Sequence, residues 1–342
     1  MMSKRIVFFN HKGGVSKTTT AYNLGWKLAE SSKVLLVDAD PQCNLTSLLI
    51  EEFDDYYINE ETKTRNIRDG VEVAFKGRPN PLSPIECYIP ERNSNLYLIP
   101  GHQNLSEYEA SLTFALTSSN AISALENLPG VFHAFIKLVE EKYGIDYTII
   151  DLNPGLSSIN QNLVMCSNYV VVPTNPDPFS LMALDTLASI LPRWSSWLSQ
   201  SGQLFSNSSY PPNLEPPKLL GSVIQRFNVR KGKAASPYRN NIQDIKIRFR
   251  DGLKPALARS NMVLPDDVYG NDFIQNGLCI SEIPDFQGLL PKSLNAGVPV
   301  FALNDHEIDE SGTVLDGMIA NRDKFDVLFN EFADKVKALV VD

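Results

Sequence analysis

The 342-residue chain is poor in the residues that build metal centres and disulfide frameworks. It has only four cysteines and four histidines, and no two cysteines form a C-x-x-C pair. The cysteines stand far apart, at Cys43, Cys87, Cys166 and Cys279. Structural zinc and iron–sulfur sites need closely spaced ligands, and secreted disulfide scaffolds are short and rich in cysteine. The sequence therefore argues against these classes and predicts free thiols in a reducing compartment.

Long apolar runs are missing as well. No segment approaches the ~18 consecutive apolar residues that a membrane-spanning helix needs. Near the N-terminus two basic residues are followed only by "IVFF" before Asn10, which is too short for the apolar core of a signal peptide. We therefore expect a cytoplasmic protein without a membrane partner.

An excess of positive charge is also absent, because the formal net charge is −9. This argues against a chain whose whole surface binds nucleic acid. The charge is uneven, however, since residues 226–260 contain ten Lys and Arg against two acids. Such a basic island on an acidic chain is either a localised anion-binding surface or a solvated helix face.

What the sequence does contain is a series of short, β-branched apolar runs separated by amphipathic segments. The runs are residues 5–9, 34–38, 96–100, 147–151, 169–173, 219–225 and 279–284. The amphipathic segments are residues 17–30, 104–117, 130–143, 179–199, 288–296 and 322–340. Continuous apolar runs suit strands buried on both faces, and their alternation with helices predicts an α/β fold with a mostly parallel central sheet.

Two stretches break this rhythm. Residues 51–95 begin acidic ("EEFDDYYINEE") and then become loop-like, whereas residues 200–217 are rich in Ser and Pro. We expect both to be surface insertions in one domain that spans residues 1–342, because no linker or internal repeat demands a second domain.

A phosphate-binding loop is predicted at residues 8–20, "FFNHKGGVSKTTT". A predicted strand precedes it and a predicted helix follows it, so backbone N–H groups and the helix dipole can hold phosphate there. In this context Lys17 would lie between the terminal phosphates and Thr18 would offer its hydroxyl to Mg²⁺. The usual G-x-x-x-x-G-K-[ST] spacing would put glycines at His11 and Ser16, so this loop is of a different kind.

Acidic residues follow two of the predicted strands. Asp38 and Asp40 end the run "VLLVDAD", and Asp151 ends "YTIID". Ligands of parallel sheets bind at the carboxyl ends of the strands, where such acids can hold water bound to Mg²⁺. We expect the metal site to comprise Thr18, Asp38, Asp40 and Asp151.

Together these motifs resemble the ParA/MinD ATPases, whose deviant Walker A signature K-G-G-x-G-K-[ST]-[ST] stands here at residues 12–19. "VLLVDADPQCNLTSLL", "YTIIDLNPGLSS", "VVVPTNPDPFSLMAL" and "EIPDFQGLLPKSLNAGVPVFAL" are similar to later segments of the family. The resemblance covers most of the chain and implies a P-loop NTPase three-layer α/β/α sandwich. It also implies slow, partner-stimulated ATP hydrolysis with Mg²⁺, closest to the ParA proteins that partition DNA or another cargo.

The resemblance assigns roles to individual residues. Lys12 reaches the phosphates of the other subunit's ATP, so ATP acts as a dimerising ligand and Lys12, Lys17 and Asp40 are the catalytic residues. ATP-binding residues are Lys12, Gly13, Gly14, Val15, Ser16, Lys17, Thr18, Thr19 and, beside the adenine, Arg226, Asn228 and Pro284. An activating protein, ParB-like or analogous, is implied. Two positions depart from the family pattern, Ser16 in place of glycine and Asp177 where glutamate is more usual.

For the basic island we expect nonspecific DNA binding that dimerisation strengthens, and hence association with the nucleoid. The candidate DNA contacts are Arg230, Lys231, Lys233, Arg239, Lys246 and Arg250. The apolar residues Ile242, Ile245, Phe249 and Leu253 would form the buried face of a helix there.

Three alternatives stay open. One is a MinD-like positioning ATPase, which needs a basic amphipathic C-terminal helix, whereas "FDVLFNEFADKVKALVVD" has more acids than lysines and is predicted to pack. Another is an iron–sulfur ATPase, which needs paired cysteines at its dimer interface. Cys43 and Cys166 do not follow that pattern. The third is a scaffold or regulator of the same fold with little or no hydrolysis, which Ser16 keeps open.

Overall fold

Seven parallel strands form one sheet in the computed structural model, which describes residues 3–117, 125–230 and 233–340. Their order across the sheet is β3-β2-β4-β1-β5-β6-β9. The strands are β1 (Lys4–Phe8), β2 (Val34–Ala39), β3 (Leu96–Ile99), β4 (Tyr147–Leu152), β5 (Tyr169–Thr174), β6 (Lys218–Phe227) and β9 (Cys279–Pro284). Each predicted apolar run is one of these strands, so the predicted parallel α/β fold is confirmed.

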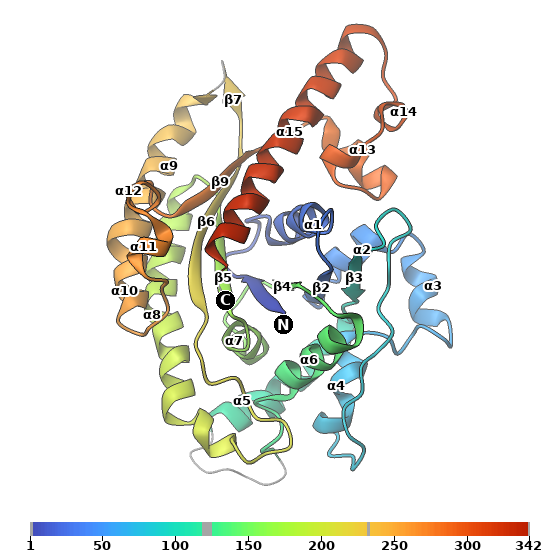
Figure 1. Ribbon diagram of the computed structural model, residues 1–342, viewed down its shortest axis with the longest axis vertical. Coiled ribbons are helices and arrows are strands. Elements are labelled where there is room, and N and C mark those ends of the chain that lie inside the picture. Colours follow the sequence, from blue (N-terminus) through green and yellow to red (C-terminus); the bar gives the residue numbers. More distant parts are fainter. Residues whose placement is uncertain (1–2, 118–124, 231–232, 341–342) are drawn as a thin grey trace.

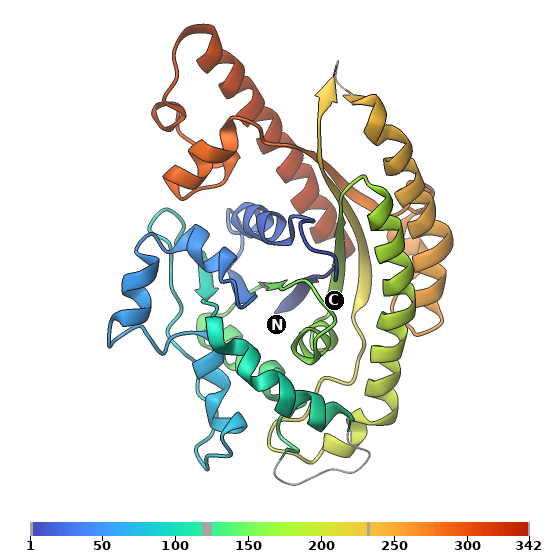
Figure 2. The ribbon, with the colours of Figure 1, turned by 180° about the vertical axis from the view of Figure 1, so that it is seen from behind.

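The strand interiors are apolar because helices cover both faces of the sheet. Every residue of β2 and β5 is buried. Helices α1 (Lys17–Leu28) and α15 (Gly312–Leu339) lie on one face, and α6 (Val131–Tyr143), α7 (Ser158–Met165) and α8 (Pro178–Gln200) lie on the other (Figures 1 and 2). This is the predicted three-layer α/β/α sandwich.

None of the remaining described helices is longer than 13 residues. They are α2 (Asn44–Leu49), α3 (Phe53–Ile58), α4 (Ile67–Phe75), η1 (Gln103–Tyr108), α5 (Glu109–Thr117), η2 (Gly202–Phe205), α9 (Ser236–Arg248), the π turn η3 (Phe249–Leu253), α10 (Lys254–Ala258), α11 (Asp266–Tyr269), α12 (Asn271–Gln275), α13 (Leu289–Ala296), η4 (Val300–Ala302) and α14 (Asp305–Ile308). The predicted buried face of α9 and η3 is confirmed, because Ile242, Ile245, Phe249 and Leu253 are all buried.

Helix α15 begins ten residues before the predicted segment 322–340. Its first three turns are largely exposed and lie with α13 and α14 away from the sheet (Figure 1). Its second half carries the fully buried apolar stripe, with Phe325, Phe329, Phe332 and Val336 buried. In the early turns Leu315, Met318 and Ile319 are only partly buried against the core, so the apolar pattern there is short and weak. Within the described ranges, no helix is both long and apolar enough to cross a bilayer.

The acidic stretch 51–95 adds two short helices beside β3. The side chain of Asn66 accepts a hydrogen bond from the Asp69 amide and so caps the start of α4. Helix α4 packs against α6, where a Cβ on Gly70 would overlap the ring of Phe135. Beyond α4 the chain is irregular until Tyr88, which forms an antiparallel bridge with Leu98. The segment thus closes one edge of the sheet.

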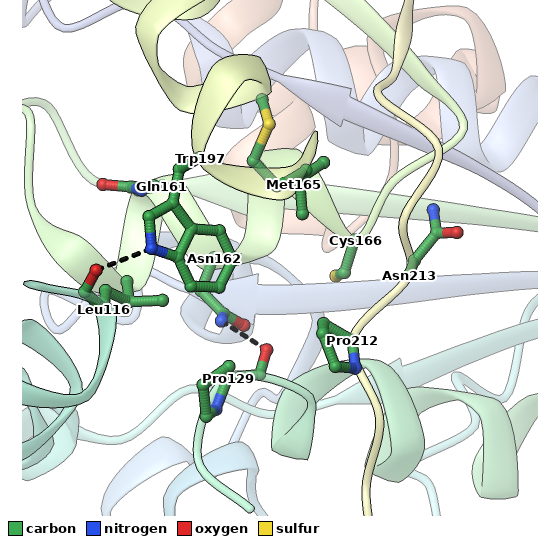
Figure 3. A pocket seen from close by; sticks show the side chains of 10 residues that line it. Leu116, Pro129, Gln161, Asn162, Met165, Cys166, Trp197, Pro212 and Asn213 are labelled. Atoms are coloured by element: carbon green, nitrogen blue, oxygen red, sulfur yellow. Dashed lines mark hydrogen bonds between the residues drawn. The ribbon is translucent and has the colours of Figure 1, made fainter. Parts of the chain in front are cut away.

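The Ser/Pro-rich stretch 200–217 returns along the side of α7 and α8. It encloses a pocket of only about 10 Å³, lined among others by Trp197, Asn162 and Pro212 (Figure 3). The indole nitrogen of Trp197 donates to the carbonyl of Leu116, and Asn162 donates to that of Pro129. Because this volume is about that of one water probe, the pocket has no room for a nucleotide.

Candidate nucleotide site

The loop between β1 and α1 is held by side chains from the two neighbouring strand ends. Asn175, just past β5, donates to the carbonyl of Gly14 at 2.8 Å. Gln225 and Arg226, near the end of β6, donate to the carbonyls of Val15 at 3.1 Å and Gly14 at 3.2 Å. Since these bonds occupy loop carbonyls, the loop amides are left to face an anion, as a phosphate cradle requires.

Two residues of this loop have left-handed backbone conformations. Gly14 has φ 71°, and Ser16, at the N-cap of α1, has φ 55° and ψ 36°. The loop therefore does require a positive φ at the position where serine replaces the glycine of the ParA/MinD pattern. A left-handed conformation costs an L-residue about 1–2 kcal/mol, and the Ser16 side chain makes no capping bond that would offset it.

The two lysines of the signature, Lys12 and Lys17, contact different groups within the chain. Lys17, the first residue of α1, is buried and donates to the carbonyl of Asn10 at 3.1 Å. Burial lowers the Lys17 pKa, and the nearby Asp151 and Asp40 carboxylates oppose that shift. Lys12 instead forms an ion pair with Asp177 at 2.5 Å. It is held outside the loop, within its own chain.

The Lys12 contact is fixed by the start of α8. Asp177 is the N-cap of that helix, and its other carboxylate oxygen accepts from the Ser180 amide at 2.9 Å. The hydroxyl of Ser180 also accepts from the Lys12 ammonium, at 3.2 Å. Asp177, noted in the sequence only as a departure, is therefore the residue that holds the signature lysine in this state.

The sheet brings two of the predicted acids side by side. Strands β2 and β4 pair in register, so Asp38 and Asp151 are direct neighbours. Asp38 accepts from the amide and hydroxyl of Thr46 at 2.8 and 2.7 Å and from the Asp40 amide at 3.1 Å. Burial raises the Asp38 pKa to about 6, although the bonds from Thr46 oppose the shift.

Asp151 differs from Asp38 in having both carboxylate oxygens buried without a hydrogen-bond partner. Burial, reinforced by repulsion from Asp38, raises its pKa to about 8. Asp40 is buried too, and one of its oxygens accepts from the Gln42 amide at 2.9 Å.

These features fit a magnesium ion. Mg²⁺ usually keeps several waters and binds through one or two protein oxygens together with substrate phosphates. The two unpartnered oxygens of Asp151 can accept from such waters, and Thr18 lines the pocket beside the phosphate loop together with Asp40. Among the described residues no three acidic, His or Cys side chains converge as a cage of their own.

Two adjoining pockets extend from the loop. One, of about 470 Å³, is lined by Gly14–Thr19 together with Asp40, Leu152 and Pro154. The other, of about 170 Å³, is lined by Ser16, Gln225, Pro284 and Phe286. Ser16, Thr19 and Arg226 line both pockets, so the two are contiguous.

Of the residues predicted beside the adenine, Arg226 and Pro284 line the smaller pocket. Asn228 lines neither pocket, and its carbonyl accepts from the Ala235 amide beside the short hairpin of β7 (Val229–Arg230) and β8 (Lys233–Ala234). Sequence reasoning missed Asn10, Asn175 and Gln225, which hold the loop, and Thr46, which holds Asp38. The asparagines follow strands directly, which is a usable signal, whereas nothing in the sequence singles out Thr46.

The predicted DNA contacts are not equivalent. Lys246 forms an ion pair with Glu282 at 2.6 Å, and Arg250 with Asp251 at 2.7 Å. Arg239 is exposed on α9. Arg230 and Lys233 belong to the β7–β8 hairpin, which follows β6 beyond the carboxyl end of the sheet (Figure 1). Lys231 lies outside the described residues.

Comparisons with known proteins agree with this geometry. A family model described as AAA domain (AAA_31) matches residues 3–199. The virulence plasmid ParA family protein pGP5-D of Chlamydia psittaci is 29% identical over 238 residues, covering 65% of this chain and 81% of that protein. The sporulation initiation inhibitor protein Soj of Bacillus subtilis is 32% identical over 188 residues, covering 54% of this chain and 64% of Soj.

A solved structure shares the fold over nearly the full length. It is a complex of a McdA variant from Cyanothece with ATP, which covers 99% of each chain with a TM-score of 0.61 and 19% sequence identity. At this identity the likeness concerns the fold alone.

We expect the Asp151→Asn substitution to stabilise the nucleotide-free chain. The unfolded chain loses the Asp151 proton near the ordinary carboxyl pKa of 3.8, whereas the folded chain keeps it up to a pKa of about 8, so the stability contributed by this group falls as pH rises between these two values. The variant should therefore gain at least about 2 °C in Tm at neutral pH, with the gain growing from pH 5 to 8. Calorimetry across pH, with the exposed Asp316→Asn as control, measures it; a gain that does not depend on pH would contradict the assignment.

A second pair of variants tests the strained position. Ser16→Gly removes the left-handed penalty and the Cβ, whereas Ser16→Ala removes only the hydroxyl. We expect Ser16→Gly to raise the free energy of unfolding by about 1 kcal/mol and Ser16→Ala to change it little, because the left-handed backbone is already present in this structure. Chemical denaturation measures both, and equal effects of the two variants would show that the hydroxyl, not the backbone, sets the stability of the loop.

Proposed function

The chain belongs to the AAA-domain family of ParA/MinD-type P-loop ATPases, and from that membership we propose that it is a slow ATPase that dimerises on binding ATP and partitions or positions a cargo. The observation that carries the proposal is a pocket lined by the phosphate loop, including Lys17, and by Asp40, close to the paired strand ends that bear Asp38 and Asp151. Relatives named as ParA, Soj and McdA proteins support a role in partition or positioning.

In this proposal the amides of Gly13–Thr19 bind the ATP phosphates, and Lys17 neutralises the charge that develops on them. Lys17 is already placed for this by its bond to Asn10. A bound Mg²⁺ would neutralise phosphate charge further; Thr18 would hold it, with Asp38, Asp40 and Asp151 supporting its waters. Asp40 would orient the attacking water. Asp151 would give up its proton on meeting the ion, because a nearby cation lowers a carboxyl pKa.

In this proposal Lys12 is the residue through which ATP promotes dimerisation. In the isolated chain Lys12 is held by Asp177 and Ser180, on the outer side of the loop. Transfer of its ammonium to a neighbouring subunit's phosphates would exchange one partly exposed ion pair for a charge-assisted contact to phosphate. ATP would then stabilise the dimer by binding it in preference to the monomer, and hydrolysis would release it.

We propose that the ATP-bound dimer binds DNA without sequence preference and positions its cargo along that DNA. Four cations of the basic island form ion pairs within the chain, which leaves less free charge there than the sequence count implies. They are Lys246, Arg248, Arg250 and Lys254. We therefore centre the DNA contact on the β7–β8 hairpin with Arg230, Lys231 and Lys233, and on the exposed Arg239. Family membership is the only support for the proposal that an activating protein and a cargo exist.

A scaffold of the same fold with little hydrolysis remains the second candidate. Ser16 favours it, because its left-handed backbone stores strain at the point where the phosphates would bind. Turnover measured with DNA and an activating partner distinguishes the two candidates.

For the dimer we expect sedimentation to show a species of twice the monomer mass with Mg²⁺–ATP only, and not with Mg²⁺–ADP or without nucleotide. Lys12→Ala should lose this dimer while binding ATP within about threefold of the parent chain. Asp177→Asn, which frees the lysine without removing it, should retain the dimer. A chain that binds ATP but stays monomeric would overturn the proposed switch.

For DNA we expect binding only with Mg²⁺–ATP, equally to two unrelated sequences. Lys231→Ala, Lys233→Ala and Arg239→Ala together should weaken it and lower the slope of log affinity against log salt by ~0.9 for each lost phosphate contact. The matched control is Lys246→Ala with Lys254→Ala, whose lysines are ion-paired, and it should change the slope little. Fluorescence anisotropy across salt concentrations measures both; equal losses would show that the ion-paired Lys246 and Lys254 contact DNA as well and would contradict the proposed surface.

A further inference from the structure

Residues 51–95 carry one side chain that reaches the acidic end of β2. Tyr57, in α3, donates its hydroxyl to the carbonyl of Gly101 at 2.6 Å. Its ring also packs edge-on against that of His102, with 5.9 Å between the ring centres. Tyr57 is thus a contact between the insertion and the turn that follows β3.

Gly101 is in turn linked to Asp38. Its amide donates to the Thr46 hydroxyl at 2.8 Å, and that hydroxyl donates to Asp38 at 2.7 Å. The contact is close, because a Cβ on Gly101 would lie 3.0 Å from the Asp38 carboxyl carbon and 3.0 Å from the Cys43 sulfur. Any shift of this turn is therefore passed to Asp38 by direct packing as well as through Thr46.

Asp38 fixes the next turn of the chain. One of its oxygens accepts from the Asp40 amide at 3.1 Å, and the other accepts from the Thr46 amide at 2.8 Å. The first bond fixes the backbone of Asp40, whose carboxylate accepts in turn from the Gln42 amide at 2.9 Å. A continuous series of contacts therefore runs from the α3 hydroxyl through Gly101, Thr46 and Asp38 to the residue that orients water in the proposed function.

We propose that Tyr57 is a positioning residue for ATP hydrolysis, which acts through Gly101 and Asp38 on the orientation of Asp40. The inference rests on the proposed ATPase function and gives the acidic insertion a role in turnover. It predicts an effect on the chemical step rather than on nucleotide binding, because Tyr57 lines neither of the two pockets beside the phosphate loop.

The test compares two isosteric variants from one helix. Tyr57→Phe removes the bond to Gly101, whereas Tyr56→Phe removes a similar bond to the carbonyl of Arg65, at 3.0 Å, that stays inside the insertion. We expect Tyr57→Phe to lower kcat about fivefold, as loss of one hydrogen bond would, and to leave the KM for ATP within about twofold. Tyr56→Phe should leave both constants near the parent values.

Hydrogen exchange gives a readout that does not require turnover. In Tyr57→Phe the amides of Gly101, Thr46 and Asp40 should exchange several-fold faster than in the parent chain, and in Tyr56→Phe they should not. Equal effects of the two variants, or unchanged exchange and kcat in Tyr57→Phe, would overturn the proposal. A parent chain without turnover would refute the ATPase function, while the exchange rates would still decide whether Tyr57 holds the Asp38 turn.

Discussion

The burial of two neighbouring carboxylates at the ends of β2 and β4 is the constraint on which the rest of the site depends. Parallel pairing in register makes Asp38 and Asp151 direct neighbours, and burial of both is unfavourable for their charged forms. The fold resolves this in two different ways. Asp38 receives three hydrogen bonds from its own loop, whereas Asp151 has none and keeps its proton more readily.

Asp38 and Asp151 therefore differ in role: Asp38 is a structural residue, and Asp151 is a candidate for binding a ligand. Asp38 organises the chain around it, since its bonds define the turn that carries Asp40 and the start of α2. Asp151 instead has two buried carboxylate oxygens without a hydrogen-bond partner, and a cation with its waters could satisfy them. In the proposed function, the pair would couple magnesium binding to the geometry of the neighbouring loop.

The phosphate loop is stable for a related reason. Its left-handed residues would be unfavourable in an isolated peptide, yet side chains from β5 and β6 hold its carbonyls from the far side. The cradle is thus assembled by three strands rather than by its own sequence. The same holds for Lys12, whose position is set by the start of α8.

Much of the fold was predictable because it rests on local periodicity. All seven sheet strands follow from continuous apolar runs, and the phosphate loop, Asp40 and Asp151 follow from their places after strands. The exposed start of α15 and the helices of residues 51–95 were missed, because exposed or short helices carry little apolar pattern. The count of basic residues overstated free charge on α9, since acids distant in sequence pair with them.

The sequence alone therefore determined the strand order along the chain, the phosphate-loop chemistry and the identity of the acids, because these depend on residue types a few positions apart. Tertiary structure alone decided which carboxylate is satisfied, which lysine is restrained and which distant side chain supports Asp38. Thr46, Gly101, Asp177 and Tyr57 reach their partners only once the sheet has formed. Such contacts depend on strand register and helix placement, which no short stretch of sequence encodes.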